Sequence, residues 1–73
     1  MAVKREQLDE IFTYHAPDDD QQIQYAKIRL AGQALCEVIL ECTPVCGDQQ
    51  AAIRKVREAV ATANAAVALK GIV

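Results

Sequence analysis

The sequence predicts an all-α protein: a helical hairpin of two long helices with a short N-terminal helix, assembled as a homo-oligomer. Thirteen alanines and seven glutamines stand against three glycines, a composition that favours helix. The two prolines, Pro17 and Pro44, divide the chain into three segments, because a proline interrupts a helix. The chain has 73 residues, enough for one domain only. We therefore expect a single helical-hairpin domain over residues 1–73.

The first segment predicts a short helix over about residues 4–12, with Leu8, Ile11 and Phe12 on one side. A helix of this length is only marginally stable by itself in water. Residues 13–17 are expected to be extended, because the residue before a proline avoids the helical region.

The second segment predicts a long helix over about residues 19–42. One of the three aspartates at 18–20 is expected to cap it, and the others suit the positive end of its dipole. An apolar stripe at helical spacing consists of Ile28, Ala31, Leu35, Val38, Ile39 and Cys42. Leu30 and Leu40 fall outside this stripe, which indicates a further apolar surface that needs cover.

The third segment predicts a helix over about residues 48–70, after a turn that contains Pro44 and Gly47. Asp48 is expected to be its N-cap. A heptad stripe follows at Ile53, Val56, Val60, Ala63 and Val67. Residues 59–69 are apolar nearly all round, and one partner helix cannot bury such a surface. This surplus predicts the homo-oligomer.

Composition and targeting signals exclude several classes of protein. The formal net charge of −2 argues against a strongly basic DNA-binding surface. The polar N-terminus lacks the apolar core of a signal peptide, and no apolar stretch has the length of a membrane span. The three cysteines leave at least one unpaired, so a secreted disulfide framework is not expected. These features favour the cytoplasm, with reduced thiols.

The sequence also predicts a protein that is not an enzyme and that holds no metal or cofactor. The chain has one histidine and no serine, which excludes a Ser-His-Asp triad. Its three glycines are isolated, so no glycine-rich phosphate loop is present. The spacing of the cysteines does not match a zinc site.

Tyr14 and His15 lie on the expected extended stretch, beside the start of a helix. A tyrosine ring can stack on a nucleobase, and an arginine can hold a phosphate with two hydrogen bonds. Lys27 and Arg29 follow in the next helix and could supply that cation. In the alternative interpretation, Phe12 and Tyr14 anchor the N-terminal segment on the hairpin, and the two basic residues are only solvated.

Three further polar residues are candidates for ligand binding. Arg54 and Arg57 form either an ordinary solvated face or an anion clamp between subunits. Asn64 stands among alanines, where it either fixes the helix register, as buried polar residues do in coiled coils, or contacts a ligand.

Two motifs carry a resemblance to a known family. Residues 12–17 read F-T-Y-H-A-P and residues 63–68 read A-N-A-A-V-A. The chain resembles, over about residues 12–70, the small helical-hairpin sponges that phages use against the CBASS and Thoeris immune systems, whose motifs read approximately F-x-Y-H-x-P and A-N-A-A-I-A.

The resemblance implies immune evasion in the cytoplasm of an infected bacterial host. Such sponges bind cyclic oligonucleotide or cyclic ADP-ribose alarm signals and sequester them without cleavage. They assemble as compact oligomers, typically hexamers, with ligands where subunits meet. No nucleic acid and no membrane is implied as a partner.

By resemblance, Tyr14 is the base-stacking residue of a cyclic dinucleotide site and Arg29 holds a phosphate, with Lys27 as the near alternative. A second site, for cyclic trinucleotides, uses a basic residue just beyond the A-N-A-A motif, where Lys70 is the nearest match. That site also uses a small hydroxylated residue, whose position is occupied here by Ala31.

Two other functions stay open from the residues alone. The first is a helical adaptor that binds a partner protein through the apolar face of residues 59–69. The second is a small nucleic-acid-binding regulator that uses Arg54, Lys55 and Arg57.

Overall fold

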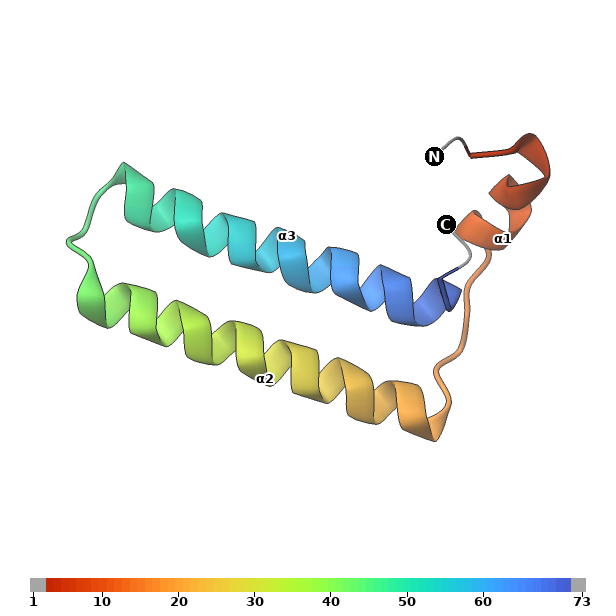
Figure 1. Ribbon diagram of the computed structural model, residues 1–73, viewed down its shortest axis with the longest axis horizontal. Helices are drawn as coiled ribbons and strands as arrows, with labels where there is room; N and C mark the ends of the chain where they lie inside the picture. The colour runs from red at the N-terminus through yellow and green to blue at the C-terminus, as the bar shows by residue number, and fades with distance from the viewer. Residues whose placement is uncertain (1–2, 72–73) are drawn as a thin grey trace.

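The computed structural model describes residues 3–71, in which every regular element is a helix and no strand occurs. The elements are η1 (Arg5–Gln7), α1 (Leu8–Phe12), α2 (Asp19–Cys42) and α3 (Gly47–Leu69). The two long helices run antiparallel and pack together, and the N-terminal arm, residues 3–17, lies at the open end of the hairpin (Figure 1).

The hairpin is a single layer of helices. The principal extents of the chain, N-terminal arm included, are 46 × 29 × 17 Å, and one helix with its side chains is about 10–12 Å across. No third described helix covers either broad face of the α2–α3 pair (Figure 1). Both faces are therefore bare in the single chain.

The helix starts agree with the sequence at α2 and differ at α3. Asp18 caps α2: its Oδ1 accepts from the Gln21 N–H at 2.8 Å, and the Gln21 side chain accepts from the Asp18 N–H at 3.0 Å. The expectation that Asp48 caps α3 is wrong, because the helix begins one residue earlier and Cys46 is its N-cap. Asp48 instead lies in the first turn, where the helix dipole still favours its charge.

The predicted stripe of α3 is confirmed, since all five of its residues are half-buried. The predicted stripe of α2 is only partly right. Ile28 and Ile39 are half-buried, whereas Ala31, Leu35, Val38 and Cys42 are exposed.

Gly32 explains why α2 is turned away from its predicted stripe. A Cβ atom at this position would lie 2.6 Å from Cγ2 of Val60. The missing side chain thus lets α3 approach the α2 backbone more closely than any other residue would allow. The two helices come closest at Gly32. The neighbouring apolar side chains of α2 therefore lie at the edge of the contact.

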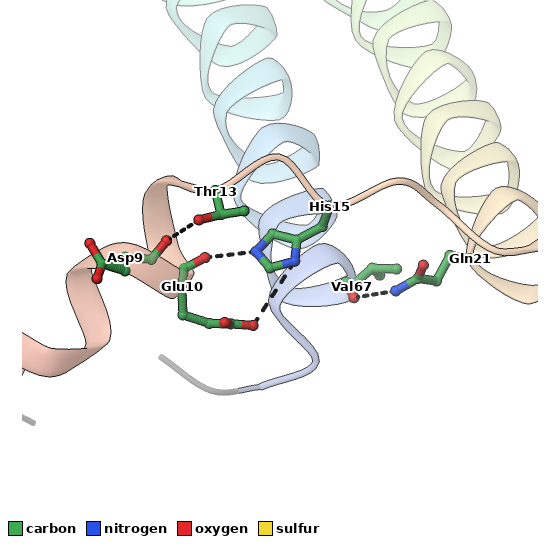
Figure 2. Close-up of polar contacts among 6 residues, drawn as sticks. All are labelled: Asp9, Glu10, Thr13, His15, Gln21 and Val67. Carbon is green, nitrogen blue, oxygen red and sulfur yellow. Dashed lines mark hydrogen bonds and ion pairs between the residues drawn. The ribbon is translucent and has the colours of Figure 1, made fainter.

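The two buried residues of the described chain are glutamines, one at each end of the hairpin. Gln21 Nε2 donates to the Val67 carbonyl at 3.1 Å, which ties the start of α2 to the end of α3 (Figure 2). Gln49 Nε2 donates to the Thr43 carbonyl at 3.2 Å and to its Oγ1 at 3.1 Å. Polar clamps therefore hold both ends of the pair.

No apolar side chain between residues 3 and 71 is buried. Phe12 and Tyr14 are each 83% exposed, so the expectation that they anchor the arm on the hairpin is wrong for the single chain. Among the described helices, none is both long enough and apolar enough to cross a membrane.

Candidate functional site

A groove of about 520 Å³ runs between the long helices on one face of the hairpin, within the size range of small-molecule sites. We call it the basic groove. It is lined by Arg29, Gly32, Gln33 and Cys36 of α2 and by Val56, Arg57, Val60, Ala61 and Asn64 of α3.

A second groove lies on the other face, which we call the apolar groove. It is lined by Ile28, Ala31, Gly32 and Leu35 of α2 and by Val56, Ala59, Val60 and Ala63 of α3. The two grooves share Gly32, Val56 and Val60. These three residues form a central seam, and the remaining lining residues lie on opposite sides of it, as helical spacing requires.

Two cations face the basic groove from different helices. Arg29 comes from α2 and Arg57 from α3, and both residues are exposed. Neither guanidinium forms an ion pair within residues 3–71, and no carboxylate lines this groove. The guanidinium fork is suited to planar anions such as phosphate, so the groove is a candidate anion site.

Asn64 lines the same groove and carries an unsatisfied acceptor beneath its surface. Its Oδ1 atom is buried and has no hydrogen-bond partner within the described chain. A buried acceptor without a donor costs about 1–3 kcal/mol. A ligand or a second chain that brings an N–H or O–H group would remove this cost.

Arg54 lies beside the basic groove rather than in it. Together with Arg57, Glu58 and Ala61 it lines a neighbouring hollow on α3. Arg57 borders both depressions. The two arginines singled out from the sequence therefore share one side of α3.

Lys27 and Lys70 lie outside the basic groove. Lys27 is exposed on α2. Lys70 follows the last residue of α3 with a left-handed backbone conformation, φ 53°. Its N–H donates to the Val67 carbonyl at 3.3 Å, which ends the helix.

Tyr14 and His15 also lie apart from the groove, in the N-terminal arm. His15 Nε2 donates to the Glu10 carbonyl at 2.7 Å, and Nδ1 lies 4.0 Å from the Glu10 carboxylate (Figure 2). The Thr13 hydroxyl donates to the Asp9 carbonyl. These bonds hold the extended stretch against α1, so His15 has a local structural role within the arm.

The residues of this site are not the same set that the sequence predicts. It brings together Arg29, Arg57 and Asn64, and it adds Gln33 and Cys36, which are not among the ligand-binding residues expected from the sequence. The spacing of Arg29, Gln33 and Cys36 is i, i+4, i+7, which puts them on one side of a helix. That spacing could have identified them.

Comparisons of the chain with protein-family models, curated proteins and solved structures find no match. Within residues 3–71, no three side chains of the types His, Cys, Asp and Glu gather as metal ligands would.

Proposed function

We propose that this protein is a phage immune-evasion sponge that binds and sequesters cyclic oligonucleotide second messengers, or related cyclic ADP-ribose signals, without cleaving them. The observation that carries the proposal is the meeting of Arg29, Arg57 and Asn64 along one groove. The resemblance of the Y-H-A-P and A-N-A-A motifs supplies the class of ligand.

The charge of the groove supports an anionic ligand. A local pair of guanidiniums can attract phosphate even though the whole chain has a net charge of −2. Charge-assisted hydrogen bonds from arginine to phosphate are among the stronger contacts available to a protein. Two cations on facing helices suit a ligand whose phosphates are held apart by a ring.

The rest of the lining supports a nucleotide rather than a bare anion. Val56, Val60 and Ala61 offer an apolar floor for a sugar or a base. Asn64 adds an amide side chain to the lining, and an amide group can pair with an amino or hydroxyl group of a ligand. A free phosphate has neither an apolar face nor an amino group and would leave these features unused.

Binding without turnover is supported by the chemistry of the lining. No imidazole, carboxylate or hydroxyl side chain lines the basic groove, so the Cys36 thiol in its lining has no neighbouring base to activate it. The arrangement suits retention of the ligand.

A homo-oligomer, a hexamer by resemblance, is part of the proposal. No apolar side chain of the described residues is buried in the single chain. Tyr14 does not line the basic groove of its own chain. A pocket that combines Tyr14 with Arg29 therefore requires two chains, which agrees with ligands placed where subunits meet.

Native mass spectrometry tests the proposal with a panel of cyclic dinucleotides, cyclic trinucleotides and cyclic ADP-ribose isomers. We expect an oligomer that carries an intact ligand. The double substitution Arg29→Ala and Arg57→Ala should weaken binding at least ~100-fold, because each charged hydrogen bond contributes roughly 1.5–3 kcal/mol. Arg5→Ala with Lys55→Ala removes the same charge elsewhere and is the matched control.

The substitution Tyr14→Ala tests the contribution of the N-terminal arm to binding separately from that of the basic groove. We expect it to abolish dinucleotide capture and to leave the oligomer intact. Unchanged affinity would remove Tyr14 from the site. A monomeric chain that ignores the whole panel would overturn the sponge and favour the adaptor that binds a partner through residues 59–69.

A further inference from the structure

We infer that the apolar groove is the docking surface for a second copy of this chain. This inference rests on the homo-oligomer in the proposed function and assigns it to one face of the hairpin. It does not depend on which ligand the basic groove holds.

The chain exposes more surface than a compact monomer of its mass. A compact monomer of 8.0 kDa exposes about 4,500 Å², whereas this chain exposes 5900 Å². The excess is about 1,400 Å² on the same scaling. One partner in a standard interface contributes roughly 800 Å². The surplus is therefore large enough for at least one complete interface with another copy.

The apolar groove is the part of the hairpin best suited to that interface. None of its eight lining residues carries a charge or a polar side chain. Leu35, on its α2 wall, is 50% exposed, and the adjacent Val38 is 52% exposed. Such a surface resembles the apolar core of an obligate homodimer interface more than the polar surface of a free monomer.

The apolar groove has a large residue on one wall and small residues on the other, so the grooves of two copies can fit together. Leu35 forms a large wall on α2, while Ala59 and Ala63 leave the α3 wall low. In a two-fold arrangement the leucine of one copy can enter the alanine trough of the other, and the exchange is reciprocal. This is the isologous contact that most soluble dimers use.

A second copy of the chain is also a partner that is always available to cover the apolar surface. A chain with no buried apolar side chain requires cover whenever it is folded, because small domains owe their stability to burial. A copy of the same chain is present wherever the protein is made. The groove offers no charged or hydrogen-bonding group that would select a different partner.

Docking on this face leaves the ligand site free. Arg29, Arg57 and Asn64 lie on the other side of the Gly32 seam. The copy docked in the apolar groove and the ligand therefore contact different sides of the same helix pair, and the chain that brings Tyr14 to Arg29 approaches from the basic side.

The test compares Leu35→Glu with Leu40→Glu by native mass spectrometry and analytical ultracentrifugation, without nucleotide. Both leucines lie on α2, with exposed fractions of 50% and 55%, and only Leu35 lines the apolar groove. We expect Leu35→Glu to raise the concentration for half-assembly more than tenfold, and Leu40→Glu to keep at least the dimer. Wild-type assembly by Leu35→Glu, or equal dissociation of both variants, would overturn the inference.

A second pair guards against a variant that fails to fold. Ala59 and Ala65 are both exposed on α3, and only Ala59 lines the apolar groove. Because glutamine is a good helix former, neither Ala59→Gln nor Ala65→Gln disturbs the isolated hairpin. Ala59→Gln should weaken assembly and Ala65→Gln should not; the opposite order contradicts the inference.

These measurements separate the docking surface from the proposed function. A wild-type oligomer that ignores every nucleotide, yet dissociates on Leu35→Glu, overturns the sponge alone. A wild-type oligomer that binds nucleotide and is indifferent to Leu35→Glu overturns the docking surface alone.

Discussion

The two faces of the hairpin are made by the same pair of helices but differ in chemistry. One face has Arg29, Arg57 and Asn64 along its groove, and the other has only aliphatic side chains and glycine. The faces share the seam of Gly32, Val56 and Val60. The side of the seam on which a residue lies therefore decides whether it contributes to a basic or to an apolar surface.

This division shows how a single layer of helices can hold two kinds of surface. In a larger domain one side of each helix is buried in a core, and the other side faces water. Here no described apolar side chain is buried, so both sides are available for contacts outside the chain. We expect the apolar side to be covered by another copy and the basic side by an anion.

Changing the seam itself should have the largest effect on stability. Gly32→Ala places a Cβ 2.6 Å from Val60 Cγ2, and overpacking of this kind costs about 1–3 kcal/mol. Urea denaturation at fixed protein concentration measures the loss. Gly47→Ala is the control, because no atom lies within 4 Å of the added Cβ; a Gly32→Ala protein as stable as this control would contradict the close approach.

A higher salt concentration should weaken binding at the basic face without weakening assembly through the apolar face. Raising NaCl from about 0.05 M to about 0.5 M should weaken nucleotide binding roughly tenfold, because it screens the arginines. The oligomer should persist, since apolar burial is not screened. Calorimetry follows the first quantity and sedimentation the second. Parallel loss of both would mean that the faces are not independent.

Asn64→Leu should move stability and binding in opposite directions. Removing the unpaired buried acceptor should stabilise the unliganded protein by about 1 kcal/mol. Ligand affinity should fall about tenfold, because the ligand's donor then has no acceptor. Thr62→Leu, at an exposed position outside both grooves, should change neither. A stability loss in Asn64→Leu would show that Oδ1 has a partner in the assembly.

The smallest expected effect lies at the end of α3. Lys70 has a left-handed backbone, which glycine adopts without cost, so Lys70→Gly should stabilise the protein by about 0.5–1 kcal/mol. Lys70→Ala removes the charge without relieving the backbone. If trinucleotide binding falls equally in both variants, Lys70 belongs to the second site implied by the resemblance; unchanged binding excludes it.

Local features of the fold could be predicted because they depend on neighbours in sequence. The Asp18 cap and the α3 stripe from Ile53 to Val67 follow from side-chain chemistry and helical spacing. The expectation of an Asp48 cap was wrong for a reason that is equally local in sequence. The Cys46 sulfur accepts the Gln49 N–H at 3.5 Å, and Gly47 is already helical.

The site was less predictable because its members come from two helices. Arg29, Arg57 and Asn64 could be named as candidates, but nothing in their spacing says that they share a groove. Tyr14 and His15 could be named for their chemistry, and the structure leaves them in the arm at the open end of the hairpin.

The sequence by itself determined that this chain forms two long helices, the bounds of α2, and that the helices carry more apolar surface than a hairpin can bury. Those properties depend on propensity, capping and composition, which act over a few residues. Only the tertiary structure decided which side of α2 meets α3. Gly32 sets that rotation, because α3 can pack most closely where α2 has no side chain. Val60 lies in this space. The separation of a basic groove from an apolar groove follows from that rotation.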